Sequence, residues 1–243
     1  MMNEGAALCV ILARAGSKGL PNKNSLMIAG KPMLAWTIEH ALTCSRIQRV
    51  LVTTDGEHLA QIAEKYDVEV IRRPAELASD TATVDAAARH AVNQVVDAHD
   101  NICLLYGNVP VRPDGLTDRA IEMLGETGAD SVQSVCPVGK NHPYWMKTVD
   151  PETGRLGMYA ENEVYRRQDL PPVYMLDGGV IAVTRSSLFC LVEGRPHAFL
   201  GSDRRAVVTE PGEVVDVDTQ EDFKTAEAVL EERLRSGTIR AVG

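Results

Sequence analysis

An apolar run at Ala7–Leu12 is followed directly by a glycine-rich, cationic loop at residues 13–24. Short continuous apolar runs are typical of buried strands in parallel sheets. Glycines in the next loop let backbone N–H groups approach an anion closely. No Asp or Glu occurs between residues 5 and 38, although the chain carries a net charge of −9. This acid-free window indicates a polyphosphate site, and we expect a nucleoside triphosphate there. The cations of the loop are Arg14, Lys18 and Lys23.

The loop differs from two familiar phosphate-binding motifs. The Walker A motif needs Gly, four residues and then Gly-Lys-Ser/Thr, whereas residues 16–19 read Gly-Ser-Lys-Gly. The dinucleotide motif Gly-x-Gly-x-x-Gly would need a glycine two positions before Gly16, where Arg14 stands. Taken alone, the segment is also compatible with a solvated surface loop.

Strand-like and helix-like patterns alternate along the chain, which favours an α/β fold whose mainly parallel sheet is covered on both faces. We expect one domain over residues 1–243. The expected strands are 7–13, 49–54, 69–71, 102–106, 131–136, 179–184 and 213–217, and the expected helices are 33–43, 57–66, 82–96, 116–124 and 221–234.

The alternation breaks at residues 138–177, a stretch rich in Pro, Gly, Tyr and charge. A loop of this length without structure is unusual inside a compact domain. We therefore expect an inserted arm of short strands that packs on a second subunit, so that the protein is a homodimer. Trp145, Tyr159 and Tyr165 suit such an interface. A mobile substrate lid is the alternative interpretation.

Composition and charge exclude several classes of protein. An acidic chain lacks the basic face of a general nucleic-acid-binding protein. No run approaches the ~20 apolar residues of a membrane span, so no membrane association is expected. Residues 1–5 carry no basic segment followed by an apolar one, and no secretory signal is expected there.

Cysteine and histidine usage points to structural roles. The five cysteines have no Cys-x-x-Cys spacing, which is typical of core thiols in a reducing compartment such as the cytoplasm. The histidines show no metal-ligand spacing. His142, directly before Pro143, is either a turn residue or a substrate contact. The cysteines are Cys9, Cys44, Cys103, Cys136 and Cys190.

Asp216-Val217-Asp218 stands at the end of the last expected strand. Side chains alternate along a strand, so the two carboxylates would share one face. Paired carboxylates at the carboxyl edge of a parallel sheet suit a hard divalent cation such as Mg²⁺. As an alternative, Asp218 or Thr219 caps the following helix.

The loop at residues 72–81 is the third chemical signal. In one interpretation Ser79 or Asp80 simply caps the next helix. In the functional interpretation Arg73 contacts a nucleotide, and the helix start at Ser79 and Asp80 contacts its ribose or base.

Together these segments resemble the acylneuraminate cytidylyltransferase family, and they share parts with 3-deoxy-manno-octulosonate cytidylyltransferases. The resemblance runs from about residue 7 to about residue 234. It is carried by Ala13-Arg14, Gly16-Ser17-Lys18-Gly19, Lys23-Asn24, Thr53-Thr54-Asp55, residues 73–78 (Arg-Pro-Ala-Glu-Leu-Ala), Arg167-Gln168 with Leu170-Pro171, and Asp216-Val217-Asp218-Thr219.

The resemblance implies a Rossmann-like nucleotidyltransferase fold with a dimerisation arm. It implies a reaction of CTP with a sugar acid, using Mg²⁺, that gives a CMP-sugar and pyrophosphate. By position, the implied catalytic residues are Arg14, Lys18, Lys23 and Asp216. The implied nucleotide-binding residues are Arg14, Gly16, Ser17, Lys18, Lys23, Asn24, Arg73, Ser79 and Asp80. The metal ligands would be Asp216 and Asp218, and Lys147 and Arg167 of the arm would approach the sugar acid.

The chain departs from the family pattern in the acceptor half. The family has Leu-Leu-Gln-Pro-Thr-Ser-Pro-Leu-Arg where residues 104–112 read Leu-Leu-Tyr-Gly-Asn-Val-Pro-Val-Arg. Tyr106 replaces the Gln, and Asn108 replaces the Thr. Ala182 is interpreted as standing where an Asn-Gly-Ala-Ile-Tyr pattern has Tyr. With Tyr106, Asn108 and Ala182 in the acceptor pocket, we expect a nonulosonic acid other than ordinary N-acetylneuraminate.

Residues 106–110 also resemble the Tyr-Gly-Asp-x-Pro segment of sugar-1-phosphate nucleotidyltransferases, in which the Asp is a metal ligand. An enzyme acting on a sugar phosphate is therefore an alternative. A non-catalytic nucleotide-binding homologue is another, and it predicts CTP binding without release of pyrophosphate.

Overall fold

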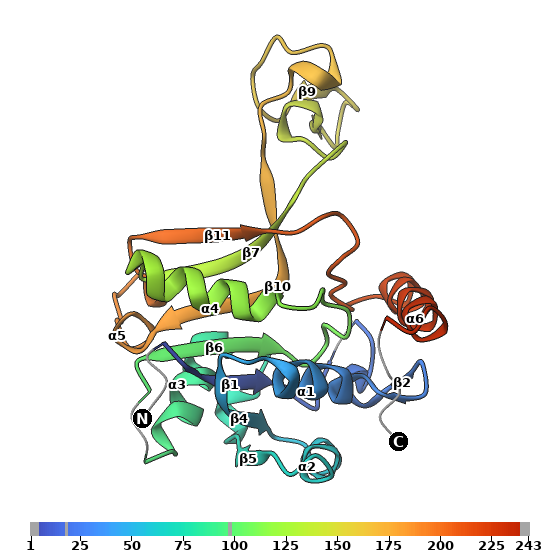
Figure 1. Cartoon of the computed structure of the whole chain (residues 1–243). Coiled ribbons are helices and arrows are strands. Elements are labelled where there is room, and N and C mark those ends of the chain that lie inside the picture. Colours follow the sequence, from blue (N-terminus) through green and yellow to red (C-terminus); the bar gives the residue numbers. More distant parts are fainter. Residues whose placement is uncertain (1–4, 18, 97–98, 239–243) are drawn as a thin grey trace.

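The computed structural model describes residues 5–17, 19–96 and 99–238. Within these residues a seven-stranded sheet has the order β11-β7-β10-β6-β1-β4-β5 (Figure 1). Strand β10 is antiparallel to both of its neighbours, and all other neighbouring pairs are parallel. The mainly parallel α/β fold is confirmed. The strands are β1 (Ala7–Leu12), β4 (Ile47–Thr54), β5 (Glu69–Arg72), β6 (Asn101–Tyr106), β7 (Ser131–Pro137), β10 (Tyr174–Thr184) and β11 (Arg204–Val208).

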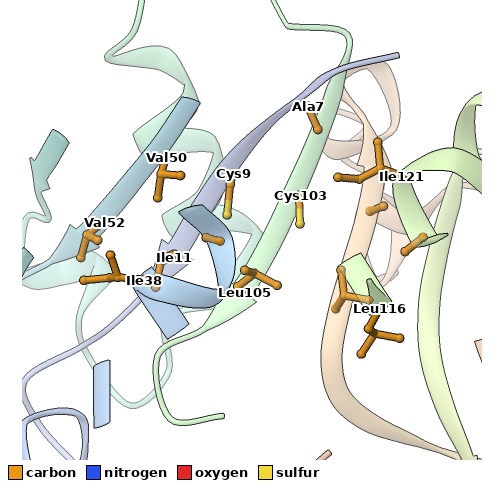
Figure 2. Close-up of a cluster of buried hydrophobic side chains, with 14 of the residues drawn as sticks. Ala7, Cys9, Ile11, Ile38, Val50, Val52, Cys103, Leu105, Leu116 and Ile121 are labelled. Atoms are coloured by element: carbon orange, nitrogen blue, oxygen red, sulfur yellow. The ribbon is translucent and has the colours of Figure 1, made fainter. Parts of the chain in front are cut away.

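Helices cover both faces of the sheet. The side chains of β1 alternate, so that Cys9 and Ile11 pack against α1 (Met33–Thr43), while Leu8 and Val10 face α3 (Val84–Asn93) on the other side. Figure 2 shows the first of these clusters, in which Ile38 of α1 lies over β1 and β4. Helices α2 (Glu57–Glu64) and α4 (Leu116–Thr127) complete the first face, and α5 (Arg185–Leu188) and the turn η5 (Ala198–Leu200) lie on the second.

Helix α6 (Gln220–Arg235) packs beyond the carboxyl ends of the strands (Figure 1). Its Ala226 and Leu230 form a third apolar cluster with Trp36 and Val217. Thr219 and Asp222 cap its start reciprocally in a capping box. The helix therefore holds the segment that precedes it against the main sheet. Two further pairs of short strands are β2 (Met27–Ile28) with β3 (Lys31–Pro32), and β8 (Lys147–Val149) with β9 (Leu156–Met158).

Strands β7 and β10 lead out of the sheet into an arm that projects from the body of the molecule (Figure 1). The arm carries the β8–β9 hairpin and two short turns, η3 (Pro143–Trp145) and η4 (Arg167–Asp169). The expected short strands are thus present. His142 is a turn residue: its ring accepts a hydrogen bond from the N–H of Tyr144 and contacts the carbonyl of Pro171 at 3.1 Å.

The prediction of a strand at residues 213–217 is wrong. Val215 makes only an isolated bridge to Val111, because this segment crosses the ends of the strands on its way to α6. The strand that completes the sheet is β11, at the edge beside β7, which the sequence did not reveal. The remaining short turns are η1 (Lys23–Ser25) and η2 (Ala75–Leu77). None of the described helices combines the length and the apolar character that crossing a bilayer requires.

Candidate active site

A cavity of about 270 Å³ lies where the loops that follow β1, β5 and β6 meet. These strands are parallel, so their carboxyl ends reach the same edge of the sheet, which is where α/β folds bind ligands. The cavity brings together most of the predicted nucleotide-binding residues and two of the predicted acceptor residues. They are Arg14, Lys23, Asn24, Arg73, Ser79, Asp80, Tyr106 and Asn108.

The loop after β1 is held by polar contacts to its neighbours. The N–H of Ala15 donates to Asp55 Oδ1 at 2.8 Å, and Asn24 Nδ2 donates to the carbonyl of Arg14 at 2.9 Å. Arg14 itself pairs with Asp80 at 2.9 Å. Gly16 is exposed and Ser17 partly so, and neither is among the residues that line the cavity. Lys18 lies outside the described residues.

The loop after β5 contributes Arg73. Its Nη2 donates to the carbonyl of Thr53 at 2.9 Å, so the guanidinium is fixed against the end of β4. Burial lowers the pKa of Arg73, while Asp55 opposes that shift and Arg14 adds to it. The next helix, α3, is capped by Thr83. The interpretation of Ser79 or Asp80 as its cap is therefore wrong, and both residues line the cavity.

The two aspartates flank a core residue. Val217 is fully buried, and the carboxylates on either side of it turn to the loops. Asp216 Oδ1 accepts from Asn108 Nδ2 at 2.5 Å, and Asp218 Oδ1 accepts from Lys23 Nζ at 2.5 Å. Burial, and then the Asp218 carboxylate, raise the pKa of Asp216 to about 6. Since Thr219 caps α6, the alternative role of Asp218 as the helix cap is wrong.

Two glycines allow this close assembly. A Cβ on Gly19 would lie 2.7 Å from the backbone oxygen of Asp218, so only glycine lets the loop after β1 approach the aspartates. Gly178, with φ of +76°, lies beside Asp216, and a Cβ there would be 3.1 Å from Asp216 Oδ2.

The donor set fits a hard cation. Asp216 and Asp218 supply only oxygen ligands, which Mg²⁺ prefers, and Mg²⁺ commonly combines one or two carboxylates with water and phosphate oxygens. Within the described part of the chain, no cluster of three or more Asp, Glu, His or Cys side chains could hold a metal by itself. A cation at this pair would therefore complete its shell with water or phosphate oxygens.

Three predicted acceptor residues lie elsewhere. Ala182 is fully buried near the end of β10, within the core that α1 and α4 cover, so its placement in a substrate pocket is wrong. If the Asn-Gly-Ala-Ile-Tyr pattern is aligned with its first residue at Asp177, its Tyr falls on Ile181, which is also buried. Lys147 and Arg167 are on the exposed arm, and neither lines the cavity of its own chain.

Arg112 is a structural residue of the site that sequence reasoning did not assign. It is 4% exposed, and its guanidinium donates to the carbonyls of Tyr106 and Gly179 and to Thr37. Burial lowers its pKa to about 10. These bonds fix the end of β6, which carries Tyr106, and the loop that follows, which carries Asn108. Two sequence motifs could have pointed to such residues. Arg112 ends the 104–112 motif, and Asp55 ends the Thr-Thr-Asp motif.

The sequence and fold are similar to those of known cytidylyltransferases. The model of the family described as "Cytidylyltransferase" matches residues 8–190. A CMP-N,N'-diacetyllegionaminic acid synthase of Legionella pneumophila is 30% identical over 92% of this chain and 96% of its own length. A pseudaminic acid cytidylyltransferase of Campylobacter jejuni is 27% identical over 90% of this chain and 94% of that protein.

Other relatives are longer. An N-acylneuraminate cytidylyltransferase of Streptococcus agalactiae is 31% identical over 89% of this chain, which spans only 51% of that protein. The solved structure of a CMP:2-keto-3-deoxy-manno-octonic acid synthetase complexed with CTP shares the fold, with a TM-score of 0.73 at 20% identity. The match covers 94% of this chain and 100% of the chain in that structure. From the family match and these relatives we conclude that the chain belongs to the cytidylyltransferase family.

Proposed function

We propose that this protein transfers CMP from CTP to the anomeric hydroxyl of a sialic-acid-like nonulosonic acid and releases pyrophosphate. The observation that carries the proposal is the meeting of two groups of opposite charge. Arg14, Lys23 and Arg73 line one cavity, and the Asp216–Asp218 pair is bonded to two residues of the same cavity, Asn108 and Lys23. Cations for phosphates and carboxylates for a metal are the two requirements of phosphoryl transfer.

The proposed reaction is an in-line displacement at the α-phosphorus of CTP. The anomeric oxygen forms the new bond to phosphorus, the bond to the bridging oxygen of the β-phosphate breaks, and pyrophosphate leaves with that electron pair. The hydroxyl proton passes to solvent or to a basic oxygen at the site. Alignment and charge neutralisation dominate such reactions. Arg14 and Lys23 supply the neutralisation, together with Lys18 of the same loop.

The nucleoside is proposed to lie deeper in the cavity. Asn24 is 3% exposed, and its Nδ2 is committed to the Arg14 carbonyl, so it fixes the loop at the point where the nucleoside would enter. Arg73, from the loop after β5, is fixed against the end of β4, and Ser79 and Asp80 line the same cavity. We propose that these residues select the base and ribose.

Mg²⁺ is the proposed cofactor, held by Asp216 and Asp218. When bound, it would neutralise charge on the phosphate oxygens and bring them into line. Lys23, which pairs with Asp218 here, would then be released to contact the triphosphate.

We also propose a homodimer formed through the arm. Apolar side chains of the arm are exposed in a single chain, among them Val149 at 62%, Leu156 at 66% and Tyr165 at 92%. A second copy of the chain would cover them. Lys147 and Arg167 would then approach the acceptor carboxylate from the partner subunit. The five cysteines are free thiols, and on that ground we propose a cytoplasmic location.

Pyrophosphate release tests the function. The purified protein, with Mg²⁺ and each of the four nucleoside triphosphates, would be assayed against nonulosonic acids, octulosonic acids and sugar 1-phosphates. We expect release with CTP and a nonulosonic acid. Release only with a sugar phosphate would replace the proposal by the sugar-phosphate alternative. CTP binding without turnover on any acceptor would favour a non-catalytic homologue.

A further inference from the structure

Asn108 is bonded to the aspartate segment through both its backbone and its side chain. The carbonyl of Asn108 accepts from the N–H of Val217 at 2.9 Å. Its side-chain Nδ2 donates to Asp216 Oδ1 at 2.5 Å and to the carbonyl of Val217 at 3.2 Å. Because a carbonyl oxygen only accepts, the contact to Val217 fixes which end of the amide faces Asp216.

These bonds add to the packing against α6 that holds the aspartate segment. Residues 213–218 belong to no strand of the sheet, and Val215 makes one isolated bridge to Val111, which also lies outside the strands. Asn108 lies two residues after β6 ends at Tyr106, and Arg112 fixes the loop that follows β6 by donating to the carbonyls of Tyr106 and Val109. The loop after β6, which Arg112 fixes, therefore helps to hold residues 213–218, which pair with no strand of the sheet.

The two oxygens of Asp216 have different surroundings. Oδ1 is engaged by Asn108, whereas Oδ2 makes no hydrogen bond to any described residue and faces Gly178. Because Gly178 has no side chain, Oδ2 is left uncovered there. A Cβ on residue 178 would lie 3.1 Å from Oδ2. An amide is a neutral donor, so it orients the carboxylate without contributing the positive charge that would repel a cation.

We propose that Asn108 is a positioning residue that holds Asp216 by Oδ1 and leaves Oδ2 for the divalent cation. This inference rests on the proposed function. The family pattern has Thr at position 108. The proposal explains its replacement by Asn through the binding of the metal rather than through recognition of the acceptor. Partners that orient metal ligands typically change metal affinity or activity by about 10–100-fold when removed.

The test compares N108L, which removes the amide, with N108T, which keeps one donor. Mn²⁺ binding to the protein–CTP complex would be followed by electron paramagnetic resonance, and steady-state kinetics would separate kcat from the KM values for CTP and acceptor. N93L is the control, because Asn93 is exposed at the end of α3. The melting temperature of each variant reports whether it is folded.

For N108L we expect about tenfold or more weaker Mn²⁺ binding and a lower kcat that extra metal partly restores, with N108T between N108L and the wild type. A rise in acceptor KM alone, with Mn²⁺ binding and kcat unchanged, would overturn the proposal and make Asn108 a substrate contact. Loss of thermal stability without a change in Mn²⁺ affinity would make its role purely structural. If the wild type binds Mn²⁺ with CTP but turns over no acceptor, the proposed function fails while the binding data still decide the role of Asn108.

Discussion

The α-carbon of Gly19 lies against the backbone carbonyl of Asp218, so closely that a Cβ would stand 2.7 Å from that oxygen. The contact joins the proposed phosphate loop to the proposed metal ligands without any side chain between them. Because backbone rather than a flexible side chain would be struck, the added atom cannot be accommodated by a change of rotamer.

G19A should therefore separate the loop from Asp218. Overpacking of this kind typically costs about 1–3 kcal/mol, and we expect CTP affinity to fall about tenfold, measured by isothermal titration calorimetry in Mg²⁺. G125A is the control, since a Cβ added to Gly125 in α4 would meet nothing within 4 Å. Equal affinity for G19A and the wild type would show that the loop can move away without consequence.

Lys23 is expected to serve the triphosphate as well as Asp218. K23M removes the cation from both, and loss of one such electrostatic group typically costs ~10²–10³ in rate. The measurement is kcat/KM for pyrophosphate release. K224M makes the same change of charge on the exposed side of α6 and should leave kcat/KM close to that of the wild type. A similar small effect for K23M would remove Lys23 from the site.

His40 gives a pH dependence that is separate from the proposed metal site. It lies on α1 with Nε2 2.8 Å from Thr117 Oγ1, and burial, followed by Arg112 and Arg233, lowers its pKa from 6.5 to about 3. Between these values the unfolded chain binds a proton that the folded chain does not. Stability is therefore fully present above pH 6.5 and falls on acidification, by at most about 1.4 kcal/mol per pH unit from this group.

H40Q should flatten that part of the profile. Urea denaturation of wild type and H40Q between pH 4.5 and 7.5 would isolate the contribution of His40 from that of the carboxylates. H58Q is the control, because His58 is exposed. Parallel profiles for wild type and H40Q would contradict the assignment.

If the proposed dimer forms through the arm, a charge placed among the exposed apolar side chains of the arm should disrupt it. L156D places a carboxylate on the exposed apolar surface of β9 and should convert the dimer to a monomer, measured by sedimentation velocity. L191D is the matched control, since Leu191 is 70% exposed and lies outside the arm. A wild type that is already monomeric would contradict the dimer, and an L156D dimer would place the interface elsewhere.

The elements with strong apolar patterns were predictable from the sequence. Helix α1 begins at Met33 and ends at Thr43, as expected, because its apolar side chains recur with helical spacing. Strand β11 was missed, since Val207 is its one buried residue and Arg204 and Arg205 begin it. The segment at 213–217 was mistaken for a strand because Val215 and Val217 alternate with polar residues, although they pack under α6 rather than in the sheet.

Most residues that line the cavity were predictable from the sequence, but the bonds between them were not. Charge patterning located Arg14, Lys23 and Asp218, and residue type suggested a metal pair. The bond between Asn108 and Asp216 joins positions 108 residues apart, which no local pattern reveals. Ala182 was misplaced because a motif does not show that both faces of β10 are covered at this point, with Ala182 in one core cluster and Ile181 in the other.

The proposed phosphate loop and the proposed metal ligands come from opposite ends of the chain, with Lys23 and Asp218 separated by 195 residues. On the ribosome, the loop, β4 and β6 emerge well before the aspartates. The cations Arg14, Lys23 and Arg73 are therefore synthesised before either carboxylate of the proposed metal pair. Premature termination anywhere before Asp218 would leave a product without the complete proposed metal pair, so translation must pass that residue before the proposed site is complete.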